Sequence, residues 1–167
     1  LIPFVICIST AHVAVASANN KADITVDLTP NVVASSLGVQ VCFDAPSDEI
    51  EIFVQTSWAG YDYNPCITVY SLTVAGVETA LKATESEHTK LLKCDSGQEV
   101  RITYTIHPDP NNADNIHGII INSTMIHLPG YALFSGPQIE CDLALRWCDV
   151  QEGWQPFSSF GAESEMH

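Results

Sequence analysis

The chain has 167 residues, of which 46% are hydrophobic. It contains six Lys and Arg and twenty Asp and Glu, which gives a formal net charge of −14. This length and composition suit one globular domain with its own core. Because such an acidic chain repels phosphate backbones and anionic lipid, we expect neither a nucleic-acid partner nor attachment to an acidic membrane surface.

The first eighteen residues have the features of an export signal. Residues 1–8 are apolar, residues 11–18 are small, and Ala16-Ser17-Ala18 has the small-x-small form that signal peptidase cleaves. A basic n-region is missing, so 1–18 is expected to be an incomplete signal peptide. The apolar run is too short for a membrane span of ~20 residues. We therefore expect a mature protein that begins at Asn19 and is periplasmic or extracellular, without stable membrane insertion. The alternative for 1–18 is a buried first strand or helix.

Residues 19–161 show the period of two that indicates half-buried strands. The clearest run places Val100, Ile102, Tyr104 and Ile106 on one face. A later run does the same with Ile139, Cys141, Leu143, Leu145 and Trp147. In chain order, the runs that fit strands are 24–28, 39–43, 50–54, 67–75, 77–82, 100–106 and 139–147.

Turn signals separate these runs, among them Gly60 and the segments 46–48, 95–97 and 108–112. No stretch combines a sustained 3.6 period with a capping box, so little helix is expected. The pattern predicts an all-β domain over 19–161, either an antiparallel sandwich or a saddle-shaped sheet pair of about eight to ten strands. Residues 162–167 are then a polar tail or the start of a connection to a further domain.

The expected mature chain contains an odd number of cysteines, so at least one thiol is unpaired. If Cys141 and Cys148 lie on one extended strand, they are ~23 Å apart, whereas a disulfide needs Cα atoms within ~7 Å. The other pairings stay open, and no Cys-x-x-Cys spacing signals a zinc or thioredoxin-type site. The five cysteines are Cys42, Cys66, Cys94, Cys141 and Cys148.

Signatures of catalysis are missing from the sequence. There is no His-Glu-x-x-His, no Gly-x-Ser-x-Gly and no glycine-rich phosphate loop. Three of the histidines are ten residues apart, a spacing with no ligand geometry behind it. We therefore predict that the chain has no catalytic, cofactor-binding or metal-binding residue. The histidines concerned are His88, His107, His117 and His127.

Three stretches combine aromatic residues with glycine beyond what a strand pattern needs. They are Ser57-Trp58-Ala59-Gly60-Tyr61, the run from His127 to Phe134 with Pro137, and Trp147 with Gly153-Trp154 and Ser158-Ser159-Phe160-Gly161. In this order, with the strand from Gly97 to Ile106 between them, they resemble the N-terminal β-domain of the glycyl-aminopeptidase-like zinc metallopeptidases, peptidase family sixty-one. The resemblance covers roughly 23–161. Pro129 departs from the aliphatic residue expected there.

The resemblance implies a non-catalytic accessory domain of an exported zinc aminopeptidase-like metallopeptidase. Such a domain packs beside the catalytic domain of the same polypeptide and helps wall its cleft, and the zinc belongs to that catalytic domain, so no cofactor is expected in this chain. The alternative is a free-standing secreted β-sandwich that binds a protein or a glycan.

An accessory domain needs a surface on which its neighbour docks, and aromatic residues favour the centres of such interfaces. Six aromatic residues lie in or beside turn signals, and we predict that several of them cluster near the exit at Phe160-Gly161. The alternative is that all six are buried corner plugs. They are Trp58, Tyr61, Tyr131, Phe134, Trp154 and Phe160.

Overall fold

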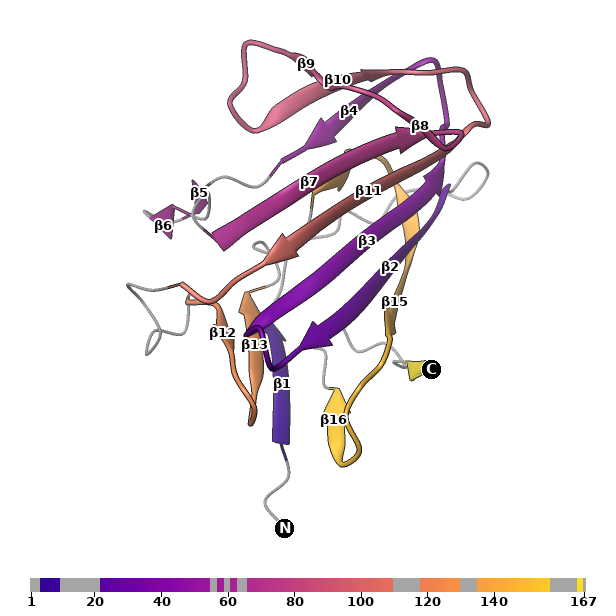
Figure 1. Ribbon diagram of the computed structural model, residues 1–167. Coiled ribbons are helices and arrows are strands. Elements are labelled where there is room, and N and C mark those ends of the chain that lie inside the picture. Colours follow the sequence, from indigo (N-terminus) through magenta and orange to yellow (C-terminus); the bar gives the residue numbers. More distant parts are fainter. Residues whose placement is uncertain are drawn as a thin grey trace.

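The protein is all-β, seen in a computed structural model that describes residues 4–9, 22–54, 57–58, 61–62, 66–109, 118–129, 135–156 and 165–166 (Figure 1). The described strands form four sheets: one of seven strands, two of four strands and the two-stranded β5–β6 hairpin. The longer strands are β1 (Phe4–Ser9), β2 (Ala22–Asn31), β3 (Ser36–Asp44), β4 (Glu49–Phe53), β7 (Ile67–Val74), β10 (Thr89–Lys93), β11 (Glu99–Ile106) and β15 (Cys141–Trp147). The shorter ones are β5 (Ser57–Trp58), β6 (Tyr61–Asp62), β8 (Val77–Glu78), β9 (Lys82–Ala83), β12 (Ile120–Ile121), β13 (Ile126–Pro129), β14 (Gly136–Pro137), β16 (Trp154–Pro156) and β17 (Glu165–Met166).

One large sheet organises the molecule. Its seven strands follow the order β17-β15-β2-β3-β11-β7-β8, and a four-stranded sheet with the order β14-β4-β10-β9 packs with it. Figure 1 shows β4, β9 and β10 beyond β7, and β1, β12, β13 and β16 at the opposite end. No α-helix occurs among the described residues, and the all-β prediction is confirmed.

The large sheet is mixed rather than purely antiparallel. β2, β3, β11 and β7 pair antiparallel, but β15 runs parallel to β2, with Leu145 opposite Val26 and Trp147 opposite Leu28. The antiparallel part of the prediction is therefore incomplete. Alternation along a strand specifies which face is buried, but it carries no information about the direction of the neighbouring strand.

The core follows from the alternation, since successive side chains of a strand point to opposite faces. The register aligns the apolar positions of neighbouring strands in rows, one of which joins Val26, Val41 and Ile102. Each of these three side chains is at most 1% exposed. The second sheet closes the core with buried residues of β4 and β10, namely Ile50, Ile52 and Leu92.

The predicted core residues lie on the expected faces, but two of them are less buried than predicted. Val100, Ile102, Tyr104 and Trp147 are buried. Leu143 and Leu145 are only partly buried against the core. β15 lies next to the end of the sheet, where only the short β17 follows it, so its middle residues have less protein around them.

The segment expected to be an export signal contains a strand in the structure. Phe4–Ser9 forms β1, which pairs parallel with β13 and with β16. The prediction of a signal peptide over 1–18 stays a prediction. Within the described ranges, no helix has the length and apolar character needed to cross a bilayer.

A tight hairpin joins β7 to the short strand β8. Val74 pairs with Val77, and the two turn residues Ala75 and Gly76 both have positive φ, 49° and 79°. Two consecutive positive φ values are the mark of a type I′ turn, whose twist suits a two-residue hairpin. Because the returning strand ends at Glu78, it covers only the last part of β7.

Candidate functional site

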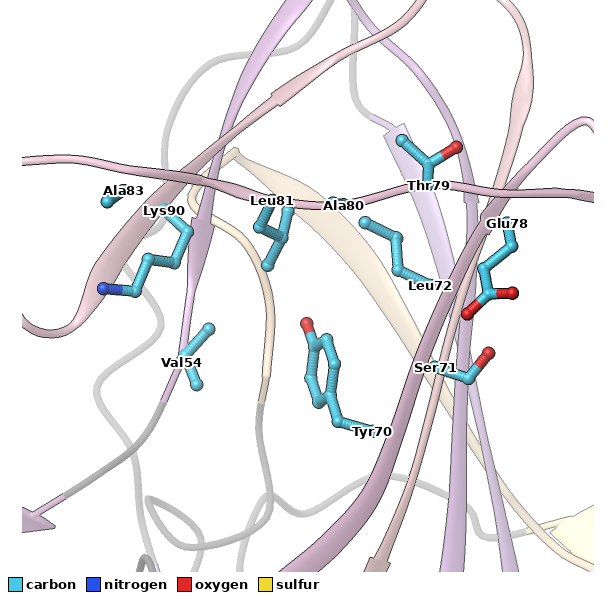
Figure 2. A pocket seen from close by; sticks show the side chains of 10 residues that line it. All are labelled: Val54, Tyr70, Ser71, Leu72, Glu78, Thr79, Ala80, Leu81, Ala83 and Lys90. Carbon is cyan, nitrogen blue, oxygen red and sulfur yellow. The ribbon is translucent and has the colours of Figure 1, made fainter.

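A pocket of about 380 Å³ opens between the two sheets, beside β7. Its walls come from β7, from the chain that leads from β8 to β9, from β10 and from the end of β4 (Figure 2). The lining residues are Val54, Tyr70, Ser71, Leu72, Glu78, Thr79, Ala80, Leu81, Ala83 and Lys90.

The crossing from one sheet to the other forms the roof of the pocket. The Thr79 amide donates to the Leu72 carbonyl at 2.9 Å, which holds the start of the crossing against β7. Leu81 packs against the core further along. A single strand was expected over 77–82, but residues 79–81 leave the large sheet and Lys82 begins β9 of the second sheet.

Tyr70 forms one side of the pocket and its ring stacks on the ring of Tyr104, with centroids 6.3 Å apart and planes 18° apart. Tyr70 is 40% exposed. Loss of water around the covered part of the ring raises the pKa of Tyr70 to about 12. Figure 2 shows the phenol of Tyr70 pointing from β7 into the space below Leu81.

Tyr104 is the buried counterpart of Tyr70. Its hydroxyl oxygen accepts a hydrogen bond from the Ser135 amide at 3.1 Å, in the interior. Desolvation raises the pKa of Tyr104 far above its ordinary value, although the Ser135 amide acts in the opposite direction. The pair thus presents one phenol that is part of the core and one that faces an open pocket.

Charge is distributed unevenly around the pocket. Three of the six Lys and Arg of this acidic chain lie on β9 and β10: Lys82, Lys90 and Lys93. Lys93 pairs with Glu49, whereas Lys90 lines the pocket and forms no ion pair with any described residue. Figure 2 shows Lys90 and Glu78 on opposite sides of Tyr70. An apolar cavity with a phenol, an ammonium and a carboxylate can hold a ligand with both apolar and charged parts.

No motif in the sequence predicts this pocket. Tyr70 and Lys90 lie on different strands with ordinary alternation, and only the packing of the two sheets brings them together. One signal was available in the sequence: the run 67–74 has no charged residue, and lysines concentrate in 82–93.

The predicted docking aromatics are only partly within the described structure. Trp154 is 6% exposed and belongs to the core, so it does not contribute to an exposed patch in this structure. Trp58 and Tyr61 are paired residues of the β5–β6 hairpin, but their side chains lie outside the described part. Tyr131, Phe134 and Phe160 also lie outside the described residues. The docking surface therefore stays a prediction.

The described histidines have local hydrogen-bond or ring partners. His107 Nε2 lies 2.9 Å from Thr68 Oγ1, His127 Nδ1 lies 3.2 Å from the Gly118 carbonyl, and the His88 ring is tilted against Phe53. His117 lies outside the described residues. Among the residues described, no group of three or more His, Cys, Asp or Glu could hold a metal ion.

The cysteines are scattered over the sheets. Cys141 and Cys148 lie at the start and just past the end of β15, an arrangement that keeps them far apart along an extended strand. Desolvation by burial is the largest cause that raises the thiol pKa values of Cys42, Cys94 and Cys148. Since the thiolate is the reactive form, these three thiols are poor nucleophiles at neutral pH.

Comparison with known proteins gives a likeness of fold. No protein-family model and no curated protein matches the chain. An aminopeptidase N family protein from Idiomarina loihiensis is similar in structure with a TM-score of 0.56 and 15% identity, and the match covers 74% of this chain and 22% of that chain. An M1 zinc metallopeptidase from Deinococcus radiodurans, solved as a mutant with a Tyr-Ser-Ala substrate, matches with a TM-score of 0.44 and 10% identity, over 75% of this chain and 31% of that chain.

This chain therefore spans less than a third of the length of either neighbour, and its fold is one that occurs within a larger aminopeptidase N family chain. The likeness concerns the fold alone, and this fold agrees with the β-domain expected from the resemblance. It does not support the assignment to peptidase family sixty-one, since the Idiomarina loihiensis protein is described as a member of the aminopeptidase N family.

Proposed function

We propose that the chain is a non-catalytic accessory β-domain of a larger, exported zinc aminopeptidase-like metallopeptidase. In this proposal it is the N-terminal domain, and it packs beside the catalytic domain of the same polypeptide and helps wall the catalytic cleft. The observation that carries the proposal is the fold likeness to the Idiomarina loihiensis protein, in which the matching part is 22% of a much longer chain.

The chemistry of the described residues supports a binding role. The pocket beside β7 combines apolar walls with single polar groups, and no described set of side chains supplies the ligands of an open zinc site. The zinc would then be held by another part of the polypeptide. The ordered aromatic and glycine motifs favour family sixty-one as the parent family, and the similar solved structure favours the aminopeptidase N family. A zinc aminopeptidase is common to both.

The coding sequence after the codon for His167 tests the proposal. We expect an in-frame continuation of a few hundred codons that encodes a helical domain with a His-Glu-x-x-His motif. A stop codon directly after His167 would contradict it.

Sequencing of the N-terminus of protein recovered outside the cytoplasm tests the export part, for which we expect a start at Asn19. An intact 1–18 segment there would remove that part of the proposal.

A second candidate is a free-standing secreted β-sandwich that binds a protein or a glycan. The open pocket between the sheets favours it, because a concave site with a few polar groups is the usual form of a binding site. The same stop codon that would contradict the accessory role is the result expected for this candidate.

A further inference from the structure

Among the described residues, strand β7 has an edge beside the pocket that is paired over only part of its length. On one side β7 pairs with β11 over most of its length, and on the other side β8 pairs only with Thr73 and Val74. Among the described residues, no strand pairs with residues 67–71 on that second side. Five residues at ~3.4 Å each leave an edge of about 17 Å, the length of an average strand.

This edge lacks the features by which proteins usually prevent strand pairing. Natural edges carry lysine, proline or inward charges, or they are very short. β7 has the sequence ITVYSLTV, with no charge, no proline and many residues of high β-propensity. A register shift against β11 occurs between Thr103 and Thr105, but it places no charge on the free side. Two of the three exposed large hydrophobic side chains among the described residues, Tyr70 and Val77, lie on β7 and β8.

The pocket lies where alternate side chains of an added strand would point. Tyr70, Ser71 and Leu72 of β7 line it, and Leu81 and Val54 form apolar walls opposite. An extended peptide next to β7 would direct every second side chain between the two sheets. An apolar side chain there would contact Leu72 and Leu81.

Charge selects the kind of peptide. Lys90 lines the pocket and has no ion pair among the described residues, so it can receive a carboxylate. Lys82, on the exposed face of the neighbouring strand β9, does not line the pocket. A second copy of this chain is a poor occupant, because two chains with a net charge of −14 repel each other.

We propose that the free edge of β7 and the adjoining pocket bind an extended segment of another polypeptide by strand addition. The segment pairs its backbone with residues 67–71, places an apolar side chain against Leu72 and Leu81, and directs an acidic side chain to Lys90. Backbone pairing provides affinity and the pocket provides specificity. The proposal does not depend on the accessory role, because the edge and the pocket belong to this chain alone.

The test uses the 167-residue chain and an acetylated, amidated heptapeptide, Thr-Val-Thr-Glu-Thr-Val-Thr, whose Val and Glu side chains share one face of a strand. Calorimetric titration should show binding, and amide hydrogen exchange should slow at Tyr70 but not in β2. The backbone of Leu72, two residues further along, points to the same edge, where its carbonyl accepts from the Thr79 amide. A peptide of the same sequence with alternate backbone nitrogens methylated should not bind, because it cannot pair as a strand.

Two variants with the same change in net charge distinguish a direct contact between Lys90 and the peptide from the effect of the overall charge of the chain. Lys90→Glu should weaken binding about fivefold or more, since it replaces an attractive pair by a repulsive one. Lys82→Glu, on the exposed face of β9, should change it less than about twofold. If Lys90→Glu lowers the thermal midpoint of unfolding, Lys90→Gln takes its place, with a smaller loss in the same direction.

Several results would overturn the proposal. Equal losses for the two lysine variants would remove the role of Lys90, and undiminished binding of the methylated peptide would remove strand pairing. If the heptapeptide does not bind at millimolar concentration, the proposal is wrong as a whole. Slow exchange at Tyr70 in a peptide-free dimer would identify a second copy of this chain as the occupant instead.

Discussion

The centre of the large sheet and its β7–β8 edge are built from similar residues but differ in strand pairing and in the exposure of their side chains. β3 at the centre pairs with β2 over Ser36–Phe43 and with β11 over Leu37–Asp44, so both of its edges are covered. β7 pairs with β11 over most of its length, but among the described residues only Thr73 and Val74 pair on its other side. Tyr70 and Val77 at this edge are 40% and 68% exposed. The difference predicts that apolar side chains at the centre contribute more to the stability of the domain than those at the edge.

The largest expected difference between the two regions is in the cost of losing an apolar side chain. Ile102 is fully buried in the central row, and Ile102→Ala should lower the free energy of unfolding by ~2–5 kcal/mol, because it leaves a cavity. Val77→Ala at the exposed edge should change it by less than ~0.5 kcal/mol. Urea denaturation measures both. Similar costs for the two variants would mean that the edge is covered and the comparison is wrong.

A second comparison uses the same substitution in two stacked rings. Tyr104→Phe should cost ~1–3 kcal/mol, because the buried Ser135 amide loses its acceptor. The hydroxyl of Tyr70 makes no hydrogen bond with a described residue, so Tyr70→Phe should cost less than ~0.5 kcal/mol. Thermal and urea unfolding of the two variants, side by side, would check this. A larger loss for Tyr70→Phe would place that phenol in the core.

The smallest expected effect is a loss of stability at alkaline pH. The folded-state pKa of Tyr70 is raised from 10.0 to about 12, so the folded chain keeps a proton that the unfolded chain releases. The contribution to stability is therefore complete below pH ~10 and is lost as the pH rises through about 12. Buried Tyr104 acts in the same direction. The ultraviolet absorbance of phenolate should show late-titrating tyrosines, one fewer in Tyr70→Phe, and ordinary titration of all five would contradict the assignment.

Alternation predicted the faces of the strands well, because burial of one face leaves a direct trace in the residue order. The alternate residues of 100–106 and the pair Ile50 and Ile52 are buried as expected; in 100–106 they are Val100, Ile102, Tyr104 and Ile106. Alternation could not predict which strands become neighbours. The parallel pairing of 22–28 with 141–147 joins segments more than a hundred residues apart and has no local signal.

The candidate site was less predictable than the fold for a similar reason. The type I′ turn at Ala75-Gly76 reverses the chain into the short β8, and the crossing at 79–81 then leads to β9 and β10 of the second sheet. Two chain reversals therefore place Lys90 in the lining of the pocket, and no sequence motif predicts them. The aromatic residues chosen from the sequence lie in turns, and turn position alone did not distinguish buried Trp154 from an exposed side chain.

The claim that this domain is non-catalytic is tested most directly by the chain itself. Purified residues 19–167 should be assayed on aminoacyl and peptide substrates, with added zinc and with a chelator, beside a sample from cells that carry the empty vector. We predict no hydrolysis above that control under either condition. Zinc-dependent, chelator-sensitive peptidase activity that copurifies with the folded domain would contradict the accessory role.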